Sequence, residues 1–322
     1  MERVATIDDA AIAAHRLIDN VERVIAGNRG SVKAAVVCLF AEGNLLLEGV
    51  PGIGKTMLAR AIARSIGGTF RRVQATPDLL PSDLTGISVY DQDRREFRFL
   101  AGPIFANVVL VDEINRTTPR TQSALLEPME ERQATVEGVT HPLPEPFLLV
   151  ATENPLEHHG TYPLPEGQLD RFTMAVPVGY PDRGKTREIV EQQMLRHPIH
   201  DLEPALSPEE VVAHQRAIRG VNLSSLVIDY AVALVEATRH HPDVTLGASP
   251  RAAVALTRCA QAAAAVEGRG YVLPDDVKAL APAVLAHRLL MRAPGQAREA
   301  GLSVVEQTLQ DVAVPLGMSP EA

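Results

Sequence analysis

The sequence predicts an α/β domain built on a parallel sheet, followed by a smaller all-helical domain. Short apolar runs, typical of buried strands, alternate with segments of helical periodicity; they lie at 44–48, 108–111 and 147–151. After about Pro181 only helical patterns follow. We therefore expect two domains, 1–185 and 186–322.

Helical spacing of apolar residues gives the remaining elements in order. In the first domain it predicts helices over 7–25, 31–40, 57–66 and 118–132. The second domain opens a helix at Ser207-Pro208-Glu209-Glu210, a capping box with proline at the first helical position. Further helices are predicted over 225–240, 250–267 and 274–291.

Composition bounds the class of protein. The chain of 322 residues is 46% hydrophobic and 22% charged, which excludes disorder over most of its length, and its lack of tryptophan predicts an aliphatic core. The longest clean apolar stretch, 34–41, is far short of the ~20 residues that a membrane helix needs. The N-terminus lacks the apolar core of a signal peptide. We expect a soluble cytoplasmic protein with no direct membrane insertion.

Charge and cysteine content narrow this further. The formal net charge of −9 disfavours general binding to nucleic acid or anionic lipid. The two cysteines, Cys38 and Cys259, lie far apart in apolar runs. They cannot form a four-ligand zinc site, and a disulfide framework is not expected.

Residues 49–56, with the sequence GVPGIGKT, match the phosphate-loop pattern G-x-x-x-x-G-K-[ST] between a predicted strand and a predicted helix. Glycines let backbone N–H groups converge on phosphate oxygens, and the helix start adds a favourable dipole. Lys55 would reach the β- and γ-phosphates, and Thr56 would ligate Mg²⁺.

A second match to the same pattern, GYPDRGKT at 179–186, is interpreted as a decoy. It places Asp182 and Arg183 where the first loop has Gly52 and Ile53, and an acid there would repel phosphate. The segments downstream are predicted to be helical, so no strand ending in an acid follows it.

Two acids, Asp112 and Glu113, follow the apolar run at 108–111. Ligands of open parallel sheets bind at the carboxyl ends of the strands. Asp112 would hold the Mg²⁺ shell, and Glu113 would orient and deprotonate the attacking water. The alternative is a solvated acid pair without a role.

Two further polar residues, Asn154 and Arg171, give weaker signals. Asn154 follows the third strand and could bind both a γ-phosphate and a water, although Asn-Pro also marks many turns. Arg171 alone favours a surface salt bridge with Asp170 or Glu166.

Arg251 follows Ser249, a predicted N-cap, and Pro250, so it falls in the first turn of a helix. The helix dipole disfavours a cation there by ~0.3–1 kcal/mol. A nucleotide phosphate between the two domains would compensate the charge. An exposed arginine without a role is the alternative.

These features together resemble the MoxR family of AAA+ ATPases, from about Ile25 to the end. The blocks GNLLLEGVPGIGKT, QATPDLLPSDLTG, GPIFANVVLVDEINRTTPRTQSALLEPMEER and ATENPLEHHGTYPLPEGQLDRF carry the resemblance. It implies an AAA+ three-layer αβα domain with a helical lid, and ATP and Mg²⁺ as ligands. It makes 49–56 the Walker A motif, Asp112 and Glu113 Walker B, Asn154 sensor 1, Arg171 an arginine finger inserted into a neighbouring subunit's site, and Arg251 sensor 2. The expected nucleotide contacts are Gly49, Pro51, Gly52, Ile53, Gly54, Lys55, Thr56 and Met57.

The resemblance also implies two insertions and shows modest departures. The helix-2 insertion would lie within about 76–105, and a hairpin before sensor 1 would span 133–147; both would face the ring pore or a client, or be ordinary loops. Glu153 stands where the family often has Gln, Gly167 where it often has Ala, and 173–177 is less apolar than usual. A less helical Gly167 could loosen the placement of Arg171.

The implied function is ATP hydrolysis in a homo-oligomeric ring, expected to be a hexamer. The ring would remodel or activate partner complexes in a chaperone-like way. The resemblance suggests a partner with a von Willebrand factor A domain, and insertion of a metal or cofactor. Alternatives are a magnesium-chelatase ATPase subunit, a nucleotide-dependent scaffold with negligible turnover, and a nucleic-acid motor, which the net charge disfavours.

Overall fold

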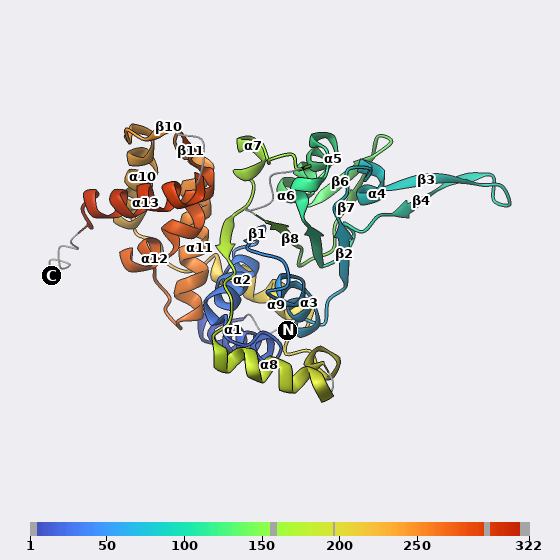
Figure 1. Cartoon of the computed structure of the whole chain (residues 1–322), viewed down its shortest axis with the longest axis horizontal. Coiled ribbons are helices and arrows are strands. Elements are labelled where there is room, and N and C mark those ends of the chain that lie inside the picture. Colours follow the sequence, from blue (N-terminus) through green and yellow to red (C-terminus); the bar gives the residue numbers. More distant parts are fainter. Residues whose placement is uncertain (1–4, 155–159, 196, 293–296, 316–322) are drawn as a thin grey trace.

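The computed structural model describes residues 5–154, 160–195, 197–292 and 297–315. Its centre is a five-stranded sheet in the order β2-β5-β8-β1-β9, with every neighbouring pair parallel (Figure 1). The strands are β1 (Leu45–Glu48), β2 (Phe70–Gln74), β5 (Val108–Asp112), β8 (Leu148–Glu153) and β9 (Met174–Pro177). The three predicted strands are confirmed as β1, β5 and β8.

The edge strands β2 and β9 were not predicted. The sequence of β2 is FRRVQ, in which polar side chains interrupt the apolar run because an edge strand exposes more of its surface. β9 is only four residues long, although three of them are buried.

Helices cover both faces of the sheet, as predicted for an α/β domain. Successive side chains of a strand point to opposite faces. Leu45 and Leu47 of β1 therefore join one hydrophobic cluster, which also contains α1 (Ile7–Glu22), α2 (Arg29–Phe40) and α3 (Lys55–Ser65). Leu46 joins a second cluster on the other face, with α4 (Pro81–Thr85) and α6 (Leu126–Glu131). The short helix α5 (Pro119–Ser123) lies against α4.

The single helix predicted over 118–132 is wrong, because the chain forms two short helices instead. α5 ends at Ser123, and α6 begins at Leu126 after a turn. Proline has no N–H to donate within a helix but is tolerated in the first turn. Restarting the helix at Leu126 places Pro128 in that first turn.

The C-terminal part is helical, apart from one short two-stranded antiparallel sheet. Its helices are α8 (Arg183–Leu195), α9 (Pro208–Ile218), α10 (Ser225–His240), α11 (Pro250–Val266), α12 (Pro274–Leu285) and α13 (Ala297–Asp311). The predicted capping box at Ser207 is confirmed. α11 packs against α1 and α2, so the two ends of the chain share one core.

The predictions that strands stop after Pro181 and that a helix continues to Met291 are both wrong. β10 (Val244–Leu246) pairs antiparallel with β11 (Leu290–Met291). Pro282 lies inside α12, and the helix ends three residues later, before a single 3-10 turn (Ala286–Arg288). Strands this short carry too little periodicity to be found in a sequence.

Two antiparallel hairpins project from the α/β domain. One pairs β3 (Gly86–Asp91) with β4 (Glu96–Ala101) inside the predicted insertion at 76–105, and it extends far from the body of the protein (Figure 1). The other pairs β6 (Gln133–Val136) with β7 (Val139–Pro142), which confirms the hairpin predicted within 133–147. The Phe99 ring of β4 stacks on His141 of β7 at 3.9 Å, so the two hairpins touch.

Two remaining observations concern the whole chain. Cys38 and Cys259 are both free and buried, as expected. Among the described residues, none of the helices combines the length and apolar character needed to cross a bilayer.

Candidate nucleotide site

The loop between β1 and α3 has the backbone conformation of a phosphate cradle. Gly54 is the N-cap of α3 with φ +97°, a left-handed conformation that favours glycine. A Cβ on Gly49 would lie 2.5 Å from the Ile53 side chain and 2.6 Å from the Val178 carbonyl, so only glycine fits there. The start of α3 therefore directs its N–H groups towards the open end of the loop.

Lys55 points across this loop and is almost completely buried. Its ammonium donates to the carbonyls of Gly49 and of Glu153, the latter at 3.2 Å. Burial lowers the pKa of Lys55, and the charges of Asp112, Glu113 and Glu153 oppose that shift. A buried cation held only by carbonyls is well suited to receive an anion such as a phosphate.

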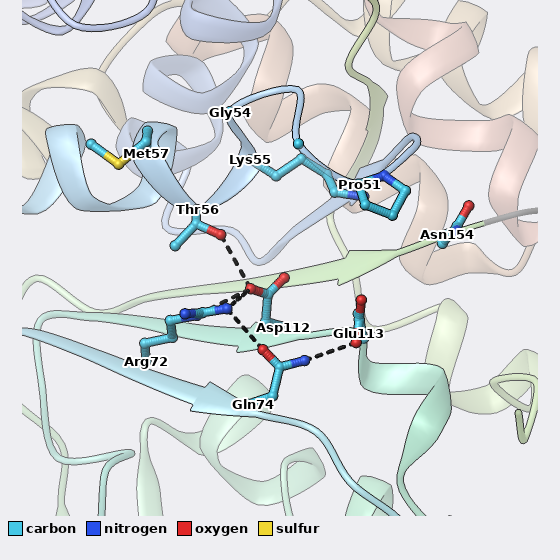
Figure 2. Close-up of a pocket in the computed structure, with 11 residues that line it drawn as sticks. Pro51, Gly54, Lys55, Thr56, Met57, Arg72, Gln74, Asp112, Glu113 and Asn154 are labelled. Atoms are coloured by element: carbon cyan, nitrogen blue, oxygen red, sulfur yellow. Dashed lines mark hydrogen bonds and ion pairs between the residues drawn. The ribbon is translucent and has the colours of Figure 1, made fainter. Parts of the chain in front are cut away.

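Asp112, at the end of β5, is the centre of a hydrogen-bond network. Thr152 Oγ1 donates to Oδ1 at 2.6 Å, and Thr56 Oγ1 and Arg72 Nη2 donate to Oδ2 at 3.1 and 2.7 Å (Figure 2). Burial raises the pKa of Asp112, but the bonds from Thr152 and Arg72 outweigh it and leave that pKa below its ordinary value. Asp112 is therefore held as a carboxylate.

The donor set fits Mg²⁺. The Thr56 hydroxyl and the Asp112 carboxylate are adjacent hard oxygen ligands, which that ion prefers. Within the described residues, no cluster of three or more His, Cys, Asp or Glu side chains could hold a metal ion. A magnesium ion would therefore take its other ligands from water and from the phosphates of a nucleotide.

Glu113 has an unusual backbone conformation, with φ +59° and ψ +50°. For a residue other than glycine, such strain costs about 1–3 kcal/mol and is found preferentially at functional sites. Gln74 Nε2 donates to its Oε2 at 2.8 Å (Figure 2), and Arg116 Nη1 donates to the same oxygen at 3.0 Å. The carboxylate is thus held at the mouth of the loop.

These groups line one cleft of about 330 Å³, a size that suits part of a small ligand. Asn154, at the end of β8, borders it (Figure 2). Of the expected nucleotide contacts, Gly49 and Ile53 lie beneath the loop rather than on the lining, since Ile53 is buried against Gly49. The lining consists of Pro51, Gly52, Gly54, Lys55, Thr56, Met57, Arg72, Gln74, Asp112, Glu113 and Asn154.

Arg171 and Arg251 lie elsewhere, in a second cavity of about 420 Å³. Both guanidinium groups form ion pairs with Oε1 of Glu130, from Arg171 Nε at 3.0 Å and from Arg251 Nη2 at 2.5 Å. Arg171 therefore does not pair with Asp170 or Glu166, the partners that the sequence suggested. The positive charge of Arg251 in the first turn of α11 is compensated by carboxylates of this chain.

Ser249 differs from its predicted role in one respect. It occupies the N-cap position of α11, but its side chain makes no capping hydrogen bond. Its hydroxyl donates instead to the carboxylate of Asp170, at 2.9 Å to Oδ2. The N-cap thus links α11 to the segment that carries Arg171.

The structure shows the surroundings of Glu153 and Gly167, two of the three departures from the family pattern. Burial raises the pKa of Glu153, an effect that Lys55 partly opposes. The Gly167 carbonyl accepts a hydrogen bond from Arg171 Nη1, and a Cβ on Gly167 would lie 4.0 Å from that nitrogen. An alanine at position 167 would therefore meet ordinary van der Waals contact and no clash. Of the block around Asn154, residues 155–159 lie outside the described residues.

Sequence reasoning missed Arg72, Gln74 and Glu130. The first two lie two residues apart on β2, so they share the face of the sheet edge that meets Asp112 and Glu113. The signal for these two residues in the sequence would have been a pair of polar residues spaced by two at the end of a strand. Glu130 is one of several acids on α6, and nothing in the sequence distinguishes it from Glu127 or Glu131.

The second phosphate-loop match adopts a different structure. Its lysine, Lys185, lies within α8 and forms an ion pair with Glu188 at 2.9 Å, with its side chain 43% exposed. The hydrogen bond to Glu188 raises the pKa of Lys185. This placement supports the interpretation of 179–186 as a decoy.

Comparison with known proteins defines the class. Residues 44–174 match the family model of the ATPase family associated with various cellular activities (AAA), and 236–319 match that of the AAA lid domain. The structure resembles that of a presumed ATPase from Cytophaga hutchinsonii, with a TM-score of 0.87 and 36% identity over 95% of this chain and 96% of that one. The chain therefore has the AAA fold with a C-terminal helical lid.

Full-length relatives give the family. The chain is 42% identical to Chaperone MoxR1 of Mycobacterium tuberculosis over 93% of its own length and 82% of that protein. It is 45% identical to the protein YeaC of Bacillus subtilis over 94% and 95%. A weaker likeness, 27%, links 75% of this chain to 56% of the magnesium-chelatase subunit ChlI of rice. The chain belongs to the MoxR family of AAA+ ATPases.

Proposed function

We propose that the protein binds ATP with Mg²⁺ in the cleft above the phosphate loop and hydrolyses it. One observation carries this proposal: Lys55, Thr56, Asp112, Glu113 and Asn154, which come from three separate segments of the chain, meet in a single cleft. Family membership supports the same activity.

Each residue then has a role that its surroundings support. Lys55 and the N–H groups at the start of α3 bind the phosphates, and Thr56 and Asp112 hold the ion. Glu113 accepts a proton from the attacking water, and Asn154 orients that water or the γ-phosphate. Magnesium supplies charge that stabilises the transferred phosphoryl group.

We propose that the catalytic site is completed by a neighbouring subunit. Arg171 and Arg251 lie outside the cleft of their own chain, and both bind the same carboxylate oxygen of Glu130. Two guanidinium groups that converge on one anion could equally bind a phosphate presented by another protomer. Rings form from such head-to-tail contacts, and we propose a hexamer.

We further propose that hydrolysis drives remodelling or activation of a partner protein. The hairpin of β3 and β4 exposes large apolar side chains, including Phe97 at 72%, far from the cleft. Such a surface suits contact with a protein client. A partner with a von Willebrand factor A domain and insertion of a metal or cofactor fit the MoxR family, whose Mycobacterium relative is named a chaperone.

Two alternatives are kept. The likeness to ChlI favours a role as an ATPase subunit of a chelatase, which would require a chelatase partner and a porphyrin for full activity. A nucleotide-dependent scaffold would bind ATP without turnover.

We also propose a cytoplasmic location and a domain boundary near residue 185.

The test is ATP hydrolysis by the purified chain with Mg²⁺, compared with the Glu113→Gln protein. Turnover in the parent and its loss in the variant, with ATP binding retained in both, would support the proposal. Equal turnover in the two proteins would favour the scaffold. Affinity capture with the Glu113→Gln protein and ATP would identify partners.

A further inference from the structure

The carbonyls of the turn that carries Arg171 are bound mainly by the C-terminal helical part of the chain. Asn44 of the α/β domain also holds the turn, because its N–H donates to Thr173 Oγ1 at 3.0 Å and its carbonyl accepts from the Thr173 N–H at 2.8 Å. This turn, residues 170–173, connects α7 (Glu166–Leu169) to β9 and forms no part of either. From the α/β domain, Asn44 Nδ2 donates to the Arg171 carbonyl at 3.3 Å. The carbonyls of the three other residues of the turn are all bound by one arginine, Arg288.

Arg288 ends the 3-10 turn after α12, and its side chain is 2% exposed. Nη2 donates to the Phe172 carbonyl at 2.7 Å and to the Asp170 carbonyl at 3.2 Å, and Nη1 donates to the Thr173 carbonyl at 3.3 Å. The adjacent His287 Nε2 lies 2.9 Å from the Phe172 carbonyl as well. A planar guanidinium carries five N–H donors in a fixed fork, so one arginine can bind several carbonyls in a defined arrangement.

The side chain of Asp170, next to Arg171, is bound in the same way. Arg288 Nε donates to its Oδ1 at 3.1 Å, and Ser249 Oγ donates to its Oδ2 at 2.9 Å. Arg251 Nη1 lies 3.8 Å from that same Oδ2. A carboxylate held by two helical segments of the lid ties the position of Arg171 to the position of the lid.

We propose that Arg288 is a positioning residue for Arg171, so that the lid of one subunit sets the arginine that the neighbouring subunit's site uses. The inference rests on the proposed role of Arg171 in a neighbouring site. Arg288 itself touches no nucleotide in this scheme. Movement of the lid would be transmitted through Asp170 and the carbonyls of the turn to the adjoining catalytic site.

The experiment mixes two defective proteins and measures whether hydrolysis returns. Arg288→Gln protein keeps an intact phosphate loop and Glu113, while Glu113→Gln protein keeps an intact Arg171 turn. In an equimolar ring, about a quarter of the interfaces join a good cleft to a well-placed Arg171, because each subunit offers one of each. We expect Arg288→Gln to lose at least tenfold in kcat with unchanged affinity for ATP, and the mixture to recover about a quarter of parental activity, as this statistic gives.

Two further variants guard against a folding defect. Ser249→Ala removes a hydroxyl that binds Asp170 but does not cap α11, so it should weaken kcat less and show the same recovery on mixing. Arg269→Gln is the matched control, because Arg269 forms a largely buried lid ion pair with Asp276 at 2.6 Å, away from the turn. It should leave kcat unchanged.

Failure of mixing to restore activity to Arg288→Gln or Ser249→Ala would overturn the inference, because it would place their effect within their own subunit's site. The reference is Arg171→Ala mixed in the same way. If that reference also fails to recover, the proposed neighbouring-site role of Arg171 is wrong; if only the Arg288 and Ser249 variants fail, Arg171 acts in the neighbour but the lid does not position it.

Discussion

The phosphate-loop cleft and the arginine cluster around Glu130, which contains Arg171, Arg251 and Arg288, differ in how their residues are brought together. The cleft gathers residues from the ends of parallel strands, where the fold brings them together regardless of the rest of the chain. The cluster joins α6, the turn at 170–173 and two lid segments, and its guanidinium groups are already neutralised by carboxylates. The cleft directs Lys55 and the start of α3 towards a ligand, whereas the guanidinium groups of the cluster already face Glu130 and Asp170.

This difference suggests how one protein can depend on a second copy of itself. A site whose cations are satisfied internally gains little from a free ligand, but it can exchange Glu130 for a phosphate once another subunit presents one.

The largest effect is expected at Lys55. Lys55→Ala removes the cation beneath the loop, so ATP binding weakens and turnover falls by more than about 10³-fold. Lys185→Ala, in the second pattern match, is the matched control and should leave turnover unchanged. Steady-state ATPase rates of both variants check this, and loss of activity in the Lys185 variant alone would reverse the assignment of the two loops.

Arg171→Ala should come next. An arginine finger contributes about 10³-fold or more to phosphoryl transfer, so kcat should fall by about that factor. ATP affinity should change little, because Arg171 lies outside the cleft of its own chain. Nucleotide titration alongside kcat separates the two quantities; a large loss of affinity would place Arg171 in its own subunit's site.

Glu113→Gln should reduce kcat by at least about 10²-fold, the contribution of a positioned general base. Gln74 and Arg116 both donate to this side chain, and an amide oxygen can still accept those bonds. Thermal stability should therefore remain close to that of the parent. A stable variant with full turnover would remove Glu113 from the mechanism.

The smallest effect concerns pH. Burial, and to a lesser extent the charge of Arg288, lowers the pKa of His287 to about 3 from 6.5. Below pH 6.5 the unfolded chain binds this proton and the folded chain does not, so the free energy of unfolding falls as the pH is lowered.

Between pH 7 and pH 5 this one group should cost about 2 kcal/mol. Denaturant unfolding at the two pH values measures it, and His287→Gln, which keeps a donor for the Phe172 carbonyl, should show a weaker dependence. If the free energy of unfolding depends equally on pH in the parent and the variant, His287 is protonated in the folded chain at pH 5, which contradicts the prediction.

The comparison also explains what could be predicted from the sequence. A continuous apolar run that ends in a glycine loop or an acid is a local pattern that can be recognised in the sequence. Strands β1, β5 and β8 and the cleft residues that follow them were predicted from such patterns. β2 was missed because its arginines hide the apolar pattern, and Arg72 and Gln74 were missed with it. The length of α6 depended on where Pro128 could be tolerated.

The partners of Arg171 could not be predicted at all. Glu130 and Arg288 lie 41 residues before and 117 residues after it in the chain, and their neighbourhood depends on how α6 and the lid pack. The sequence marked Arg251 by its unfavourable position in the first turn of a helix, whereas it identified Arg171 only through family resemblance and suggested Asp170 or Glu166 as its partner. Asp170 instead binds Arg288 and Ser249.

The central claim is that an active cleft needs an arginine from an adjoining protomer, and mixing Arg171→Ala with Glu113→Gln protein tests it most directly. Each protein alone should be nearly inactive. The equimolar mixture should hydrolyse ATP at about a quarter of the parental rate, since a quarter of the interfaces pair an intact Glu113 with an intact Arg171. A mixture no more active than its two components would contradict the claim and confine catalysis to a single chain.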